Sequence, residues 1–249
     1  MQVYVFTHII KHMFYTDAHC HIKPSEIAPQ IAGCIYNSAT MTDWQTAINI
    51  ADNDDDKNFA AIGIHPWHID GAAQDWDEQM RYILKTHPNI MVGEIGLDKF
   101  KPDMDKQLEF FGTQLEIAAQ FHRPVHLHCV GAWDKILHIF KTHEKNMPPT
   151  ILAHAFTGHI DLIEMLANKY NMYFSYSVPN TDTTRARVAA TPKNRILVET
   201  DIFDASNQVS ELDTAIRSIA NLQKYDSDAM SEQIYQNFNG VISYVRSIA

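Results

Sequence analysis

The sequence predicts a single α/β domain built as a (β/α)8 barrel, the TIM-barrel architecture. Short apolar segments alternate with longer helical ones, eight of the short segments fit within the chain, and metal-binding types of side chain recur where these segments end. The chain has 249 residues, of which 45% are hydrophobic and 20% are charged, as in ordinary globular proteins. It has only nine glycines and no Ser/Gly-rich or Pro-rich run, so we expect no interdomain linker.

The predicted strands are short and mostly apolar, which is typical of a parallel sheet buried on both faces. They cover residues 14–19, 31–37, 59–64, 90–94, 124–128, 150–154, 172–175 and 196–199. An open, doubly wound sheet is the alternative architecture. It is disfavoured because no G-x-G-x-x-G motif follows the first strand.

The predicted helices lie between and after these strands, at about 43–52, 75–86, 103–121, 132–145, 159–169, 182–190, 209–223 and 228–246. The clearest is 103–121, where apolar residues recur at spacings of four and three, namely Met104, Leu108, Phe111, Leu115 and Ala118. This spacing places them on one helix face that can pack against the sheet.

The first residues stand apart from this alternating pattern. Residues 1–12 lack the basic segment and the small-residue cleavage site of a signal peptide, and they match no element of the pattern. We therefore expect an N-terminal extension at 1–12 and a barrel domain at 13–249.

Net charge and cysteine content indicate which partners and which cellular compartment to expect. A net charge of −10 argues against a surface built to hold long nucleic acids, although a metal site can still attract short or single-stranded ends. The cysteines Cys20, Cys34 and Cys129 are odd in number and widely spaced, which favours reduced thiols in a cytoplasmic protein. No apolar run approaches the roughly 18 residues of a membrane helix, so we expect no membrane contact.

Side chains that bind metals follow the predicted strands. His19 and His21 alternate onto one face of the first strand, and we expect Asp17 on the same face. Later strand ends supply His65, Glu94, His128, His154 and Asp201. Imidazole and carboxylate are ligands of zinc, manganese and similar ions, so the sequence predicts a divalent-metal site at the carboxyl ends of the strands.

One further histidine is expected to be structural. His126 shares the strand face of His128 but lies one layer deeper in the predicted barrel. We therefore interpret it as a hydrogen-bonded core histidine and not as a metal ligand.

Taken together, the motifs resemble those of the TatD family of metal-dependent hydrolases, in the amidohydrolase-like superfamily. The resemblance runs from Met13 to the C-terminus. It rests on Asp17-Ala-His19-Cys-His21, Gly63-Ile-His65-Pro66, Gly93-Glu94-Ile-Gly96-Leu-Asp98, Pro124-Val-His-Leu-His128, His154-Ala-Phe-Thr-Gly158 and Glu199-Thr-Asp201.

The resemblance implies a site for two divalent ions such as zinc, magnesium or manganese. One ion would be held by His19, His21 and Asp201, the other by His128 and His154, with Glu94 bridging both. Glu94 and Asp201 would be the catalytic residues, because Asp201 would orient a hydroxide activated by the two ions and accept its proton.

The resemblance further implies that His65, Asp98 and Glu199 bind substrate or support the ligands. Near the expected substrate, the chain departs from the family pattern at Val130 and at the residues after Asp201, which are Ile202, Phe203 and Asp204.

A site with two divalent cations and two carboxylates carries net positive charge, which favours an anionic substrate. We therefore expect a phosphodiesterase or deoxyribonuclease acting on DNA ends or small phosphoesters, with no protein partner. Two alternatives stay open. One is an amidohydrolase-type amidase or lactonase, and the other is a catalytically inactive barrel that binds metal.

Overall fold

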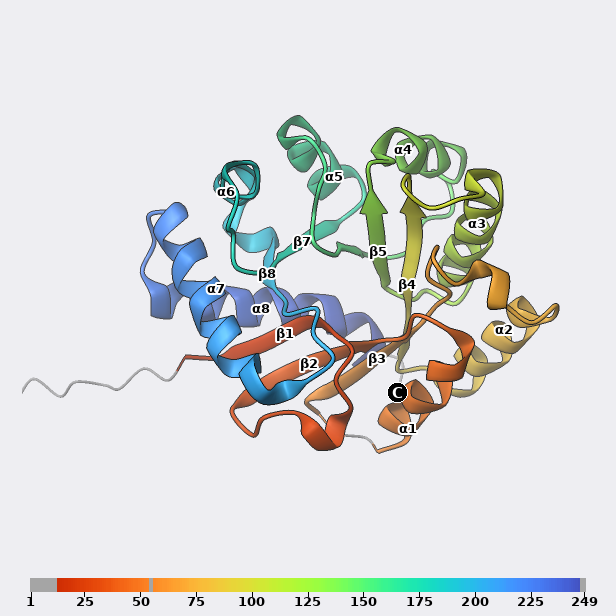
Figure 1. The fold of residues 1–249 in the computed structure, drawn as a ribbon, viewed down its shortest axis with the longest axis horizontal. Helices are drawn as coiled ribbons and strands as arrows, with labels where there is room; N and C mark the ends of the chain where they lie inside the picture. Colours follow the sequence, from red (N-terminus) through yellow and green to blue (C-terminus); the bar gives the residue numbers. More distant parts are fainter. Residues whose placement is uncertain (1–12, 54–55, 247–249) are drawn as a thin grey trace, which may run out of the picture.

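The computed structural model describes residues 13–53 and 56–246 as a barrel of eight parallel strands (Figure 1). The strands are hydrogen-bonded in chain order, which confirms the predicted (β/α)8 architecture and excludes the doubly wound alternative. They are β1 (Tyr15–Cys20), β2 (Ile31–Asn37), β3 (Asn58–Ile62), β4 (Ile90–Asp98), β5 (Val125–Val130), β6 (Ile151–Ala153), β7 (Met172–Tyr176) and β8 (Ile196–Val198). The predicted extension at 1–12 lies outside the described residues.

Helices surround the strands on the outside of the barrel (Figure 1). They are α1 (Trp44–Asp52), α2 (Trp76–Thr86), α3 (Met104–Gln120), α4 (Trp133–Thr142), α5 (Ile163–Lys169), α6 (Asp182–Ala190), α7 (Gln208–Leu222) and α8 (Ser227–Arg246). In α3 the predicted apolar face is the packed face, with Phe111, Leu115 and Ala118 fully buried. No helix among the described residues is long and apolar enough to cross a membrane.

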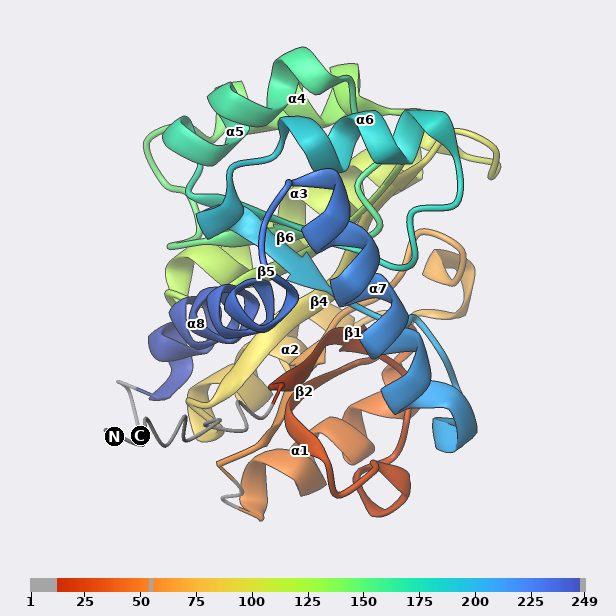
Figure 2. The ribbon, with the colours of Figure 1, turned by 90° about the vertical axis from the view of Figure 1, so that its left-hand side faces the viewer.

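Helix α8 closes the end of the barrel where the strands begin. Its Asn237 side chain donates hydrogen bonds to the carbonyl oxygens of Lys193 (2.8 Å) and Ile196 (2.7 Å), at the start of β8. Phe238, Val241 and Ile242 pack against apolar side chains from the strands. Figure 2 shows α7 and α8 together beside β1, which both helices contact. The opposite end of the barrel, at the carboxyl ends of the strands, is the end where a functional site is expected.

Residues after β8 join the last strand to the first. The backbone amide of Thr200 donates to Asp17 Oδ1 (3.0 Å) and its hydroxyl donates to Asp17 Oδ2 (2.6 Å). The amide of Asp201 donates to the His19 carbonyl (2.9 Å), and the amide of His21 donates to the Ile202 carbonyl (2.9 Å). These bonds hold Asp201 beside the two histidines of β1.

The prediction that Asp17 shares a face with His19 and His21 is wrong. Between Asp17 and Cys20 the register advances three residues in β1 but only two in β2, from Cys34 to Tyr36, so β1 contains a bulge. The extra residue reverses the alternation, and Asp17 points outward to α7, where Gln208 Nε2 donates to its carboxylate (2.9 Å). Asp17 therefore holds the barrel together and does not face the strand-end site.

Candidate metal centre at the strand ends

The predicted site residues come together in one pocket of about 260 Å³ at the carboxyl ends of the strands. Its lining includes His21, His65, Glu94, His128, His154 and Asp201. His19 lies beneath these residues and is fully buried. Six of the predicted residues thus line the pocket, and a seventh forms its floor.

Glu94 is the centre of the cluster because its two carboxylate oxygens face different groups of histidines. Glu94 Oε2 lies 3.3 Å from His19 Nε2 and 4.0 Å from His21 Nε2. Glu94 Oε1 lies 2.8 Å from His128 Nδ1, 3.4 Å from His65 Nε2 and 3.6 Å from His154 Nε2. One carboxylate therefore contacts both halves of the cluster.

Two glycines of β4 allow this close packing around Glu94. A Cβ on Gly96, where φ is +152°, would lie 1.8 Å from the backbone oxygen of His128. A Cβ on Gly93 would lie 2.5 Å from the Cβ of His126. Only glycine lets β4 approach β5 this closely, and the approach brings Glu94 to His128.

Asp201 is the carboxylate that faces the open part of the pocket. Its side chain is 46% exposed, with Oδ1 at 3.4 Å from His21 Nε2 and Oδ2 at 3.9 Å from His154 Nε2. Its backbone is left-handed, with φ of 57°, a conformation that aspartate enters more readily than most residues. Asp201 can therefore contact both the buried cluster and a bound substrate.

Hydrogen bonds on the far side of two histidines fix which ring nitrogen faces the site. His21 Nδ1 lies 2.8 Å from the carbonyl oxygen of Asn37, and His154 Nδ1 lies 3.1 Å from Glu199 Oε2. Since both partners accept, Nδ1 carries the proton in each ring. In the neutral rings, the Nε2 lone pairs of His21 and His154 then face the site and can bind a metal.

His65 has the opposite arrangement. The backbone amide of Trp67 donates to His65 Nδ1 (3.1 Å), so in the neutral ring the proton lies on Nε2, which faces Glu94. His65 is therefore set up as a hydrogen-bond donor in the pocket. Pro66 indicates a turn after His65, but the sequence alone does not show that the Trp67 amide donates to the His65 ring.

Glu199 and Asp98 are almost fully buried and lie behind the pocket. Besides His154, the carboxylate of Glu199 accepts hydrogen bonds from the Ala155 amide (2.9 Å) and the Ser175 hydroxyl. Asp98 accepts from the Trp67 indole (2.6 Å) and the Phe100 amide (2.8 Å). Both carboxylates are thus engaged by protein donors.

Burial and mutual proximity set the ionisation of the cluster. Burial acts to raise the pKa of Glu94, but the neighbouring His19 and His154 outweigh it and hold that pKa well below its usual value. Burial acts to lower the pKa of His154, but Glu199, Glu94 and Asp201 outweigh it and raise that pKa to about 10. Burial lowers the pKa of His19. Glu94 is therefore ionised beside a His154 ring that holds its proton, and a bound cation can replace that proton.

The donor set fits metal ions. At the strand ends, three groups of ligand atoms lie within 4.8 Å of one another: His19, His21 and Asp201; His19, Glu94 and His154; and His65, Glu94 and His128. Both ring nitrogens of His19 and Nε2 of His128 are buried without a hydrogen-bond partner among the described residues. Unpaired buried nitrogens beside ionised carboxylates are what a divalent ion would satisfy.

The expectation for His126 is correct in part. It is fully buried and belongs to none of the groups of possible ligands among the described residues. It is not hydrogen-bonded, however, since neither ring nitrogen has a partner there. Burial holds its pKa well below the usual value, so it packs as a neutral ring beneath His19.

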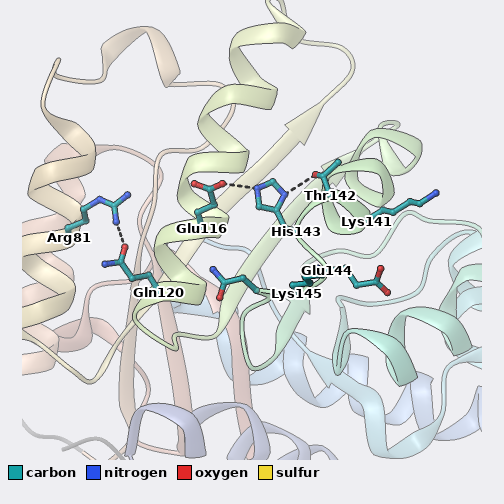
Figure 3. A pocket seen from close by; sticks show the side chains of 9 residues that line it. Arg81, Glu116, Gln120, Lys141, Thr142, His143, Glu144 and Lys145 are labelled. Carbon is teal, nitrogen blue, oxygen red and sulfur yellow. Dashed lines mark hydrogen bonds and ion pairs between the residues drawn. The ribbon is translucent and has the colours of Figure 1, made fainter.

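A second hollow, of about 800 Å³, lies on the outside of the barrel between α2, α3 and α4 (Figure 3). Its polar side chains mostly bind one another. His143 Nε2 lies 3.0 Å from Glu116 Oε1, and Arg81 donates to Gln120. This hollow is larger than the strand-end pocket, but none of the possible metal-ligand groups found among the described residues lies in it.

Comparison with known proteins finds related sequences that are named as a metal-dependent hydrolase and as nucleases. The chain is 31% identical over 153 residues to "Uncharacterized metal-dependent hydrolase YjjV" of Escherichia coli, covering 59% of this chain and 58% of that protein. It is 27% identical to the human "3'-5' RNA nuclease TATDN2", covering 75% of this chain but 28% of that protein. It is 25% identical to "3'-5' ssDNA/RNA exonuclease TatD" of Erwinia tasmaniensis, covering 69% and 68%.

Solved structures share the fold. The TatD homologue YJJV from Escherichia coli superposes with a TM-score of 0.77 at 21% identity, covering 91% of this chain and 97% of that one. A TatD family hydrolase from Entamoeba histolytica gives 0.76 at 15% identity, covering 92% and 98%. The family described as TatD related DNase matches residues 16–243. With this match across nearly the whole barrel, the chain belongs to the TatD-related DNase family.

Proposed function

We propose that the protein is a phosphodiesterase that uses two divalent ions to cleave single-stranded nucleic-acid ends or small phosphoesters. The observation that carries the proposal is the placement of Glu94, whose two oxygens face separate groups of ligand atoms. The names of two relatives support the substrate class, since they describe nucleases of RNA or of single-stranded DNA and RNA.

His19, His21 and Asp201 would hold one ion, and His128 and His154 the other, with Glu94 shared between them. The chemistry that such ions supply is acidification of water and polarisation of a phosphoryl oxygen. The outward bonds of His21 and His154 direct the Nε2 atoms of these rings at this region, and both ring nitrogens of His19 are buried there without a hydrogen-bond partner among the described residues.

The remaining steps belong to the side chains. Asp201 reaches the open pocket and would accept the proton of the attacking water at its carboxylate. His65 would donate a hydrogen bond from Nε2–H to an oxygen of the phosphoryl group. We propose that Glu199 and Asp98 act indirectly, Glu199 by orienting His154 and Asp98 by orienting Trp67.

The test combines metal analysis with assays of three substrate classes. Protein stripped by a chelator and reloaded with Mn²⁺, Zn²⁺ or Mg²⁺ is given a phosphodiester, single-stranded DNA or RNA, and an amide and a lactone. We expect hydrolysis of the phosphodiester and of single strands, with no hydrolysis after chelation.

Three other results would count against this function. Cleavage that survives complete metal removal would refute the mechanism. Turnover of the amide or lactone without turnover of any phosphodiester would identify an amidohydrolase. Stoichiometric metal without hydrolysis of any ester or amide would identify a metal-binding barrel.

A further inference from the structure

We propose that Phe203 is a stacking platform for the nucleobase next to the scissile phosphate, an inference that rests on the proposed phosphodiesterase function. Phe203 follows Asp201 by two residues and lines the strand-end pocket. Its ring is stacked on His21, with centroids 4.5 Å apart and an angle of 11° between the planes. The side chain is nevertheless 74% exposed, so the face turned away from His21 is open to solvent.

The position of Phe203 is fixed although its side chain is exposed. On its N-terminal side, the Asp201 amide is bonded to the His19 carbonyl, and the Ile202 carbonyl accepts from the His21 amide, each at 2.9 Å. On its C-terminal side, the Asp204 carboxylate accepts from the Ser206 amide (2.7 Å). Apart from its stack on His21, this large apolar ring is open to water and contacts no other ring among the described residues, so it is preorganised to bind a flat ligand group.

Trp67, the other exposed aromatic side chain of this pocket, is less suited to the role. Its indole N–H is donated to Asp98 at 2.6 Å, and Lys101 Nζ lies 3.9 Å from the centre of its ring. One face of Trp67 is therefore covered, and its orientation is set by Asp98. Among the described residues, Phe203 has only His21 as a ring partner.

The chemistry of the neighbours identifies the ligand group. The cluster of Glu94, Asp201 and the histidines, once loaded with divalent cations, attracts a phosphate. A flat apolar face lies directly against His21, one of those histidines. A group that combines an anionic phosphate with a flat aromatic ring within one residue is a nucleotide, and bases of all kinds stack on aromatic side chains in single-strand sites.

Two measurements test this inference, on wild type and on F203A, F203L, F203W and F100A. In the first, metal-loaded protein is titrated with deoxyadenosine 5′-monophosphate and with deoxyribose 5-phosphate, which lacks the base. In the second, kcat/KM is compared for single-stranded oligonucleotides that differ by one abasic residue at the last or the penultimate position. Phe100 is the matched control, because it is 76% exposed at the same end of the barrel but does not line the pocket.

We expect wild type to favour the base-bearing ligand and substrate by about tenfold or more. The ratio between base-bearing and base-free ligands or substrates should fall to about one in F203A and F203L. It should be close to the wild-type value in F203W and in F100A. In wild type, kcat/KM should also be higher with a purine than with a pyrimidine at the same position, because the stacking area of a purine is larger.

Failure of the inference is separable from failure of the proposed function. Metal-dependent hydrolysis with no base preference, or with a preference that survives in F203A, would overturn the inference and leave the phosphodiesterase standing. A binding preference that F203A abolishes, in a protein that hydrolyses no phosphodiester, would support stacking at Phe203 and overturn the proposed function.

Discussion

At the scale of single residues, the site depends on carboxylates placed between imidazoles. Glu94 is 4% exposed and faces five histidine nitrogens, whereas the Asp201 side chain is 46% exposed and faces the pocket. The two acids therefore have different tasks. The Glu94 carboxylate is occupied by its histidine neighbours, whereas Asp201 can contact the water and the substrate.

The Asp201→Asn substitution should lower kcat by about 10²-fold or more, because an amide cannot accept the proton. The fold should stay intact, since the Asp201 backbone bond to His19 is retained. Steady-state kinetics and circular dichroism check both statements. Asp182→Asn is the matched control, since the Asp182 carboxylate is 99% exposed on α6, bonds Arg185 and does not line the pocket, and it should keep normal kcat. Near-normal turnover in Asp201→Asn would remove that residue from the mechanism.

The pH dependence of metal binding should follow His154, whose pKa is raised to about 10 by its acidic neighbours against the effect of burial. Coordination needs the neutral ring, so below that pKa each ion bound there displaces about one proton. Apparent affinity should then rise about tenfold per pH unit from pH 7 to 9. Calorimetry in buffers of different ionisation enthalpy measures the proton release.

Glu199→Gln provides the control for this pH dependence, because Glu199 is the strongest of the neighbours that raise the pKa of His154. Its removal should flatten the slope above pH 7. A wild-type affinity that is constant above pH 7 would contradict a raised His154 pKa.

At the scale of elements, the decisive feature is the bulge in β1. It turns Asp17 outward to Thr200 and Gln208 while it leaves His19 and His21 facing inward. A single strand thereby supplies both the bond that closes the barrel and two groups for the metal centre. The backbone bonds from Asp201 and His21 across the same junction couple the position of the pocket to the closure of the barrel.

Because of Asp17, the free energy of unfolding should fall as pH rises from about 4 to 6. Burial raises its pKa to about 6 from 3.8, so the folded state holds this proton more tightly than the unfolded state. The stabilisation is complete below the unfolded pKa and is lost as pH rises through the folded one, by about 2 to 3 kcal/mol in total. Urea unfolding of wild type and Asp17→Asn at pH 4 to 7 isolates this contribution. A difference between the two proteins that does not change with pH would contradict it.

At the scale of the whole molecule, periodicity was sufficient for the architecture and for most of the site. Apolar segments of strand length, separated by amphipathic helices, specify eight βα units, and the barrel brings every strand end to one face. That is why His19, His21, Glu94, His128, His154 and Asp201 could be grouped without coordinates.

What periodicity could not show depends on local irregularities of the backbone and on contacts between distant segments. The β1 bulge breaks the alternation that placed Asp17, and the direction of the Trp67–His65 hydrogen bond is set by a local turn. The strand predicted to end at Glu94 continues to Asp98, since Gly96 allows pairing with His128. Glu199 matched the expected motif, but only the fold shows that His154, Ala155 and Ser175 engage its carboxylate.

The most direct test of a centre bridged by Glu94 is the number of ions bound per chain, measured by elemental analysis after gel filtration of wild type, Glu94→Ala and Glu94→Gln. The Gln variant preserves side-chain volume, so it separates loss of the bridging carboxylate from loss of packing. We predict two ions in wild type and at most one in each variant, with turnover abolished in both and the circular dichroism spectrum unchanged. One ion in active wild type, or two ions and near-normal turnover in Glu94→Ala, would contradict the bridged centre.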